Sequence, residues 1–274
     1  MVRKIIVKTI LNKHRRDSWF LDDYSLNPYE ACAFNCVFCY IRGSKYGRNM
    51  QKSLSVKVNA CRLLEKEISV RMKREEYGFI IISSSTEAWQ RIEEKYKLTR
   101  RMLKIIARYK FPVHVLTKST LVLRDLDVLK EIDRNAFIPQ DLRGRINHGV
   151  FMTFSLSTLD EHVSKIFEPN APTPAERLEA MKECRKKGFL TGVAYIPVLP
   201  FISDSYEELD EMIKTAKEFG AHYVFVGALT LFGACKEIYT AVLKKHFPEL
   251  LPKYRRLFRI FNQPSKAVSY THLT

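Results

Sequence analysis

The feature that most constrains the fold of this 274-residue chain is a repeated alternation of short apolar runs with amphipathic segments. Short apolar runs bounded by turn residues are typical of buried strands, and the segments between them have apolar residues at helical spacing. Gly188 and Gly220 follow two of the predicted helices, at positions where helices commonly end. Apolar strands that alternate with helices predict an α/β protein, in which helices cover a parallel sheet.

The alternation can be followed through most of the chain. We expect strands at residues 4–10, 78–83, 112–117, 149–156, 191–196 and 222–226, and helices at residues 52–74, 99–109, from about 124, 174–187 and 206–219. A further extended run ends where Asn27 and Pro28 interrupt it. The count is then six strand–helix units, fewer than the eight of a closed barrel, and catalytic groups should lie at the carboxyl ends of the strands.

Three of the six cysteines lie close together in the loop after that extended run. Cys32, Cys36 and Cys39 are separated by three and then two residues. Thiols at this spacing, in a chain whose start does not resemble a signal peptide, suit a metal better than disulfides. Three thiolates leave a four-iron cluster, or a tetrahedral zinc ion, one ligand short, and an open position is typical of reactive metal sites. A zinc knuckle completed by a histidine, or three incidental thiols, would also explain the pattern.

Composition limits the compartment and the partners. No apolar run approaches the ~18 residues of a membrane span, so we expect a cytoplasmic protein that does not enter the membrane. The net charge is +16, and much of it lies near the two ends of the chain. This charge favours a polyanionic partner such as nucleic acid, and a lysine-rich, heat-adapted surface would explain it equally well.

Polar side chains follow several predicted strands, at the end where catalytic groups should lie. They are Ser85, Thr86, Glu87, Lys118 and Ser155. Because the carboxyl ends of parallel strands meet at one edge of the sheet, these side chains should face one cavity beside the cysteine loop. An ammonium, a carboxylate and several hydroxyls suit a small polar ligand. Capping of the following helices would also explain the Ser and Thr residues.

The cysteine motif, with Phe38 just before its last cysteine, resembles the signature of the radical S-adenosylmethionine (SAM) superfamily. The resemblance implies a [4Fe-4S] cluster on Cys32, Cys36 and Cys39, with one iron left to chelate SAM. It implies reductive cleavage of SAM to methionine and a 5′-deoxyadenosyl radical, with Phe38 beside the adenine. It also implies a partial (β/α)6 barrel of the TIM type and an electron donor such as a ferredoxin or flavodoxin.

The wider pattern resembles one branch of that superfamily, the spore photoproduct lyase-like proteins, or DNA-repair photolyase homologues. The stretches that carry it are NPYEACAFNCVFCY, STEAWQRIEEKYKLTRR, VLTKSTLVLRDLDVL, SLSTLDEHVSKIFEPNAPTPAERLEAM and AYIPVLPFISD, between residues 27 and 204. By this resemblance Lys118 and Ser155 contact the methionine part of SAM, and Ser85 or Thr86 is a third contact. Glu87 would bind the SAM ammonium or a ribose hydroxyl.

Other positions match or depart from this branch. Arg124, Glu168 and Arg177 fall on its motifs without an assigned role. Ala31 stands where the branch usually has Gly, and Glu87 where it usually has Asp. True spore photoproduct lyases place a hydrogen-donating cysteine near the end of the second strand, where this chain has none. Cys235 is then the remaining candidate for a catalytic thiol, and reversal of thymine dimers is not expected.

We therefore expect three parts: a basic N-terminal segment (residues 1–23), a radical SAM partial barrel (24–230), and a basic C-terminal extension and tail (231–274). Residues 236–261 of the extension should form two amphipathic helices, and the last ten residues show no periodic pattern. The expected activity is lyase-like or oxidoreductase-like hydrogen abstraction, with nucleic acid as the candidate substrate. The alternatives are a radical SAM enzyme acting on a small molecule or protein, and a zinc-stabilised, non-catalytic nucleic-acid-binding protein. The sequence leaves the oligomeric state open.

Overall fold

The computed structural model describes residues 2–44, 47, 53–260 and 262–264, so the tail at 265–274 lies outside the described residues. In that part of the chain the main sheet contains six parallel strands, which lie side by side in chain order: β3 (Asp22–Leu26), β6 (Phe79–Ile82), β7 (Val113–Thr117), β8 (Val150–Leu156), β9 (Leu190–Val198) and β10 (Tyr223–Ala228). At one edge β2 (Leu11–Lys13) pairs antiparallel with β3. The open α/β sheet of six parallel strands confirms the partial barrel.

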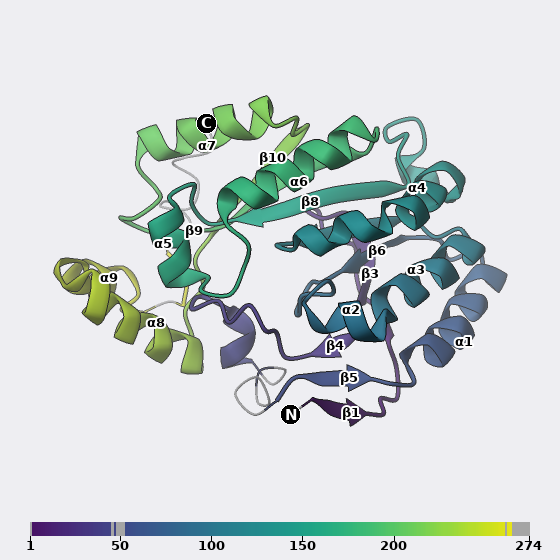
Figure 1. Cartoon of the computed structure of the whole chain (residues 1–274), viewed down its shortest axis with the longest axis horizontal. Helices are drawn as coiled ribbons and strands as arrows, with labels where there is room; N and C mark the ends of the chain where they lie inside the picture. The colour runs from purple at the N-terminus through teal and green to yellow at the C-terminus, as the bar shows by residue number, and fades with distance from the viewer. Residues whose placement is uncertain (1, 45–46, 48–52, 261, 265–274) are drawn as a thin grey trace.

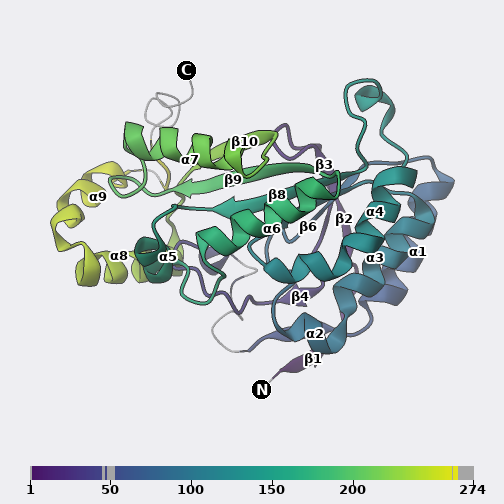
Figure 2. The same ribbon diagram turned by 45° about the horizontal axis from the view of Figure 1, so that its top comes forward.

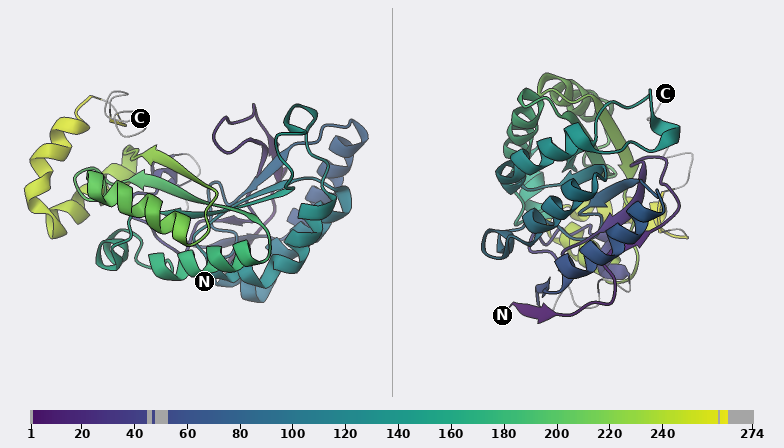
Figure 3. Two further views of the ribbon diagram at one scale, coloured as in Figure 1. Left: turned by 90° about the horizontal axis from the view of Figure 1, so that it is seen from above. Right: turned by 90° about the vertical axis from the view of Figure 1, so that its right-hand side faces the viewer.

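Helices cover one face of this sheet. The described helices are α1 (Ala60–Lys73), α2 (Ile92–Tyr96), α3 (Leu98–Tyr109), α4 (Leu126–Asn135), α5 (Glu161–Phe167), α6 (Pro174–Lys186), α7 (Tyr206–Glu218), α8 (Gly233–His246) and α9 (Leu251–Leu257), with 3₁₀ turns η1 (Tyr40–Gly43), η3 (Thr120–Asp125), η4 (Gln140–Leu142) and η5 (Pro248–Leu250). Figures 1 and 3 show α1, α3, α4, α6 and α7 along the same side of the curved sheet.

The predicted boundaries of α6 and α7 are confirmed, because local signals fix both ends. Each helix begins at a capping box, in which the side chain of Thr173 or Ser205 accepts a hydrogen bond from a backbone N–H of the first turn. Each is followed by a glycine with positive φ, Gly188 at 76° and Gly220 at 89°.

The predicted strand at residues 4–10 is wrong, because the chain divides there between two sheets. β1 (Arg3–Ile5) pairs with β5 (Ser55–Lys57) in a small sheet that also contains β4 (Tyr29–Glu30). Between β1 and β2, side chains replace the strand ladder: Asn59 bonds both backbone groups of Val7, and Glu67 accepts the N–H groups of Ile10 and Leu11. The predicted helix at 52–74 begins only at Ala60, because β5 occupies the residues before it.

Aromatic side chains close the amino-terminal end of the sheet on the face turned away from the helices. The ring of Phe20 lies 5.7 Å from that of His114 and 5.3 Å from that of Phe225. His114 is fully buried; its ring nitrogens bond the Phe20 carbonyl (2.8 Å) and the Thr153 hydroxyl (2.6 Å). Burial lowers the pKa of His114 from 6.5 to about 4.

This lowered pKa predicts a pH-dependent stability. The unfolded chain takes up a proton on His114 below pH 6.5 that the folded chain does not bind. The contribution of His114 is therefore present above pH 6.5 and is lost as the pH falls toward 4, by roughly 3 kcal/mol in total. Urea unfolding of His114→Gln between pH 7.5 and 4 should show a flatter dependence than the wild type. The exposed His162→Gln control should keep the wild-type slope, and equal slopes for all three proteins would refute the prediction.

A second core joins the C-terminal helices to the cysteine loop. Val37 and Phe38 pack with Cys235, Tyr239 and Leu243 of α8, and with side chains of α5 and α9. Figures 1 and 2 show α8 and α9 near α5, at the end of the sheet toward which β8 points. A Cβ on Gly43 of η1 would lie 2.3 Å from the Phe232 carbonyl oxygen, so the two segments touch through backbone. The two predicted helices therefore form: α8 contacts the cysteine loop, and α9 packs against α8.

Candidate active site

The three motif cysteines lie on the loop between β4 and η1, beside the carboxyl ends of the parallel strands. Burial raises the pKa of Cys32 to about 11 and also raises the pKa values of Cys36 and Cys39. Backbone N–H groups of Glu87 and Phe34 donate toward Cys32 and lower its pKa in part. The charges of Cys32 and Cys39 both act on Cys36, so the three thiols share one small region.

The number of these thiols suits a four-iron cluster with one open iron. A zinc ion needs thiolate sulfurs at about 2.3 Å from one point, whereas each thiolate of an iron–sulfur cluster binds its own iron. Three cysteines on one loop therefore fit a four-iron cluster and leave one iron for another ligand.

Neighbouring segments hold the backbone around Cys32 from both sides. The buried Gln90 side chain accepts the N–H of Ala33 at 2.9 Å and donates to the carbonyl of Ala31 at 3.4 Å. From the other side, Asn170 donates its side-chain amide to the Ala33 carbonyl at 3.0 Å. Sequence reasoning missed the roles of Gln90 and Asn170, although both lie in stretches that carry the family resemblance.

Ala31 explains why glycine is usual just before the first cysteine. Its φ is +67°, a left-handed conformation that is unfavourable for residues with a Cβ. Ala31→Gly should therefore raise the free energy of unfolding by up to about 1 kcal/mol. Ala241→Gly, at an exposed interior position of α8, should lower it by about 1 kcal/mol. Urea unfolding measures both changes, and destabilisation by Ala31→Gly would contradict the assignment.

The loop after β6 carries Ser85, Thr86 and Glu87, and it is tied to the cysteine loop. Asn27 accepts the N–H groups of Ser85 (3.0 Å) and Thr86 (3.2 Å), and the Thr86 hydroxyl donates to the carbonyl of Tyr29 at 3.2 Å. The structure thus brings these residues to the predicted edge of the sheet. It also engages the Thr86 hydroxyl with protein, so Ser85 is the better placed of the two for a ligand.

Glu87 joins the same loop to the end of β7. Its buried carboxylate accepts the Thr117 hydroxyl (2.8 Å) and the N–H groups of Trp89 (3.0 Å) and Lys118 (2.9 Å). Burial raises its pKa, and these donors oppose that rise. Glu87 therefore orients the backbone at Lys118, and three of its acceptor positions are already in use.

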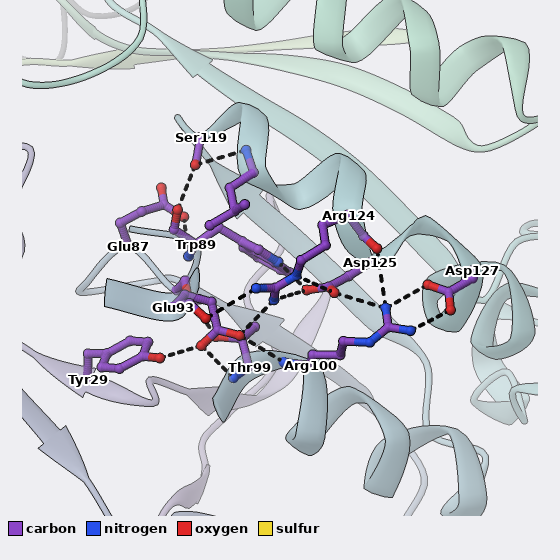
Figure 4. Close-up of polar contacts among 12 residues, drawn as sticks. Tyr29, Glu87, Trp89, Glu93, Thr99, Arg100, Ser119, Arg124, Asp125 and Asp127 are labelled. Carbon is purple, nitrogen blue, oxygen red and sulfur yellow. Dashed lines mark hydrogen bonds and ion pairs between the residues drawn. The ribbon is translucent and has the colours of Figure 1, made fainter. Parts of the chain in front are cut away.

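A buried ionic network behind this loop explains several charged residues of the second and third family stretches (Figure 4). Arg124 donates to Glu93 and to Asp125, each at 2.7 Å, and Arg100 pairs with Asp125 at 3.0 Å. The Trp89 indole donates to Asp125 at 2.9 Å. Arg124 therefore has a structural role, in which it joins the start of α2 to η3.

Lys118 lies where the predicted ligand contacts meet. Its ammonium donates to the Ser155 hydroxyl, and it lies 5.8 Å from the centroid of the Phe38 ring. It also pairs with Glu168 at 3.2 Å. The structure thus brings together Lys118, which follows β7, Ser155 of β8 and Phe38 of the cysteine loop.

Glu168 and Arg177 form a buried pair next to these residues. Arg177 contacts Glu168 at 2.6 Å and donates to the carbonyls of Ser155 (2.9 Å) and Pro172 (2.7 Å). Burial alone would raise the pKa of Glu168, but the charges of Arg177 and Lys118 hold it below its usual value. Glu168 is therefore an anion between two cations.

The candidate catalytic thiol is enclosed beside the cysteine loop. Cys235 is fully buried in the second core, with its thiol 3.8 Å from the Val37 carbonyl, and burial raises its pKa to about 12. This environment favours a structural thiol.

Comparison with known proteins agrees with this geometry. The family model described as the radical SAM superfamily matches residues 26–216, which is more than half of the chain. This protein belongs to the radical SAM superfamily. It is therefore a radical SAM enzyme. The match spans four whole strands of the parallel sheet, β6 to β9, and a zinc-stabilised binding module would not need such a sheet.

Individual proteins and solved structures are also similar to this radical SAM enzyme. An uncharacterised protein of Mycobacterium tuberculosis is 29% identical over 262 residues, which cover 93% of this chain and 73% of the relative. A spore photoproduct lyase mutant, solved with AdoMet and a dinucleoside spore photoproduct, aligns with a TM-score of 0.64 at 15% identity over 89% of this chain. Streptococcus suis SuiB bound to the precursor peptide SuiA gives a TM-score of 0.53 at 16% identity, over 87% of this chain and 47% of SuiB.

The structural matches establish the fold of the radical SAM enzyme, and with it the structural likeness to spore photoproduct lyase. The chain spans 66% of the length of the lyase chain. Among the described residues, none of the helices has the length and apolar character needed to cross a membrane.

Proposed function

We propose that this radical SAM enzyme holds a [4Fe-4S] cluster on Cys32, Cys36 and Cys39 and binds SAM between the cluster and Lys118. The observation that carries the proposal is the position of the Lys118 ammonium. It contacts the Ser155 hydroxyl, lies beside the Phe38 ring, and its charge acts on Cys36. An ammonium, a hydroxyl and an aromatic ring complement the carboxylate, the amino group and the adenine of SAM.

When bound, the cluster and SAM supply an electron and a 5′-deoxyadenosyl radical for hydrogen abstraction. The chain's own residues hold and shield these groups. Lys118 and Ser155 orient the ligand, while Gln90 and Asn170 fix the backbone on which Cys32 lies. The second core excludes water from the side of the cysteine loop that faces α8. A reducing, cytoplasmic location and a ferredoxin-like or flavodoxin-like donor suit such a cluster.

We propose nucleic acid as the substrate class. Helix α8 contacts the cysteine loop, and α9 packs against α8. The exposed basic residues on and just after these helices are Lys244, Lys245, Lys253, Arg255, Arg256 and Arg259. A basic surface beside a reactive site suits a phosphate backbone. The structurally similar lyase was solved with a dinucleoside lesion, which supports the same class. β6 has the sequence FIII and holds no cysteine that could donate hydrogen there, so we propose a reaction other than thymine-dimer reversal.

The basic surface predicts a salt-dependent affinity. Substituting Arg255, Arg256 and Arg259 with glutamine should reduce the slope of log affinity against log salt by about 2 to 3, because each phosphate contact contributes about 0.7 to 0.9. The affinity for oligonucleotides of all sequences should fall by a similar factor, because phosphate contacts do not depend on sequence. Fluorescence anisotropy with labelled single- and double-stranded oligonucleotides measures the slope. The matched control replaces Arg62, Lys66 and Lys73 of α1 with glutamine, and equal slopes for the two triple variants would exclude a specific role for α9.

A peptide is the second candidate substrate, because the structurally similar SuiB binds a precursor peptide. Deuterium transfer separates the two. Oligonucleotides deuterated on the sugar and base methyl positions should pass deuterium to 5′-deoxyadenosine, and deuterated peptides should not. Transfer from peptides alone would refute nucleic acid as the substrate.

A further inference from the structure

Three charged side chains from different elements meet beside the proposed SAM site: Lys118 after β7, Glu168 after α5 and Arg177 on α6. Arg177 is 0% exposed and Glu168 is 2% exposed. Burying an ion pair costs the hydration free energy of both charges, which can exceed the attraction between them. A gain in folding stability therefore does not explain why this pair is buried here. The family resemblance gives Glu168 and Arg177 no role.

The group is ordered from a fixed interior end to a more accessible end. Arg177 is held at three points, by Glu168 and by the carbonyls of Ser155 and Pro172. One Glu168 oxygen faces Arg177 at 2.6 Å, and the other faces the Lys118 ammonium at 3.2 Å. Lys118 is the most exposed of the three, with 14% of its side chain accessible. Glu168 contacts both cations, so the firmly held Arg177 restrains Glu168, and Glu168 in turn restrains Lys118.

The segment that carries Glu168 is also bonded to the cysteine loop. The Val37 N–H donates to the Phe167 carbonyl at 2.8 Å, and Asn170 donates to the Phe34 and Ala33 carbonyls at 3.3 and 3.0 Å. Residues 167–170 thus contact the loop on both sides of Glu168. Because Glu168 also contacts Lys118, these bonds hold Lys118 at a fixed position relative to the cysteine loop.

We propose that Glu168, with Arg177 as its counter-charge, is the positioning residue of the SAM site. This inference rests on the proposed SAM contact of Lys118. A lysine side chain has much rotamer freedom, and binding a carboxylate with a mobile ammonium loses that freedom on every binding event. Glu168 keeps Lys118 beside Ser155 and Phe38 before SAM arrives. The remaining donor capacity of the ammonium is left for the SAM carboxylate.

The test measures SAM affinity in variants that remove the anchor without leaving a buried charge alone. Glu168→Gln with Arg177→Met removes both members of the buried pair, which proteins often tolerate, whereas Glu168→Gln alone leaves Arg177 without a full partner. Glu183→Gln with Lys186→Met, an exposed pair on the same helix α6, is the matched control. Calorimetry on anaerobically reconstituted protein gives the dissociation constant for SAM, and iron content and thermal unfolding show that fold and cluster persist.

We expect the Glu168–Arg177 double variant to bind SAM about tenfold or more weakly, with iron content near that of the wild type, and the control to bind normally. A mutant cycle with Lys118→Met tests whether the pair acts through Lys118. In the Lys118→Met background, removing Glu168 and Arg177 should change SAM affinity less than twofold. Normal SAM binding by the double variant, or an equal loss in both backgrounds, would overturn the inference. Normal binding by Lys118→Met would instead refute the SAM contact on which it rests.

Discussion

Replacing Cys32, Cys36 or Cys39 with alanine should each abolish the iron content of anaerobically reconstituted protein, from about four irons per chain to none that survives desalting. Each thiolate binds a different iron, and the described residues offer no obvious substitute. Cys235 is enclosed in the second core, where its thiol contacts the Val37 carbonyl. Loss of one of three ligands therefore removes the cluster, not just one of its irons.

Cys61 and Cys184 provide the controls for this experiment. Cys61 is on α1 and Cys184 on α6, both packed against the core between the sheet and its helices. Cys61→Ala and Cys184→Ala should keep full iron and sulfide. Zinc in place of iron, or full loading after loss of Cys36, would show that the three-cysteine assignment is incorrect.

Lys118→Ala should weaken SAM binding by about 1.5 to 3 kcal/mol, the range for a hydrogen bond to a charged group, which is roughly a ten- to hundredfold rise in the dissociation constant. The change removes the ammonium that meets Ser155 and Glu168, and it should leave iron content unchanged because lysine is not a ligand. Calorimetric titration of the loaded protein with SAM measures the change directly.

Lys130→Ala is the comparison for Lys118→Ala. Lys130 is on α4, where its ammonium contacts Asp133 and the Gly188 carbonyl, far along the chain from the cysteine loop. It should bind SAM as the wild type does. Wild-type affinity in Lys118→Ala as well would leave Lys118 as a structural partner of Glu168.

Much of the fold could be predicted because its signals are local. The apolar runs at β6 to β10 and the glycines after α6 and α7 fixed these elements to within a few residues. The strand at residues 4–10 failed because its outcome depends on Glu67 and Asn59, which are far away in sequence. The short helices α2 and α5 contain too few turns to show a helical period.

The site could be predicted in part for the same reason. Strand ends are local signals, so Lys118 and Ser155 could be predicted as candidates, and the structure brings them together. The pairing of Lys118 with Glu168 and Arg177 depends on how β7, α5 and α6 pack, and no local pattern records it. The bonds that engage Thr86 and Glu87 likewise come from Tyr29 and Thr117, so their SAM contacts stay predictions.

Measuring 5′-deoxyadenosine shows whether this chain uses a three-cysteine cluster to cleave SAM reductively. Anaerobically reconstituted protein is reduced with dithionite in the presence of SAM, and the product is quantified by chromatography beside a Cys36→Ala control. We expect 5′-deoxyadenosine and methionine in equal amounts, at one or more equivalents per chain, with none from the control. Fully loaded and reduced protein that forms no more 5′-deoxyadenosine than Cys36→Ala would contradict this expectation.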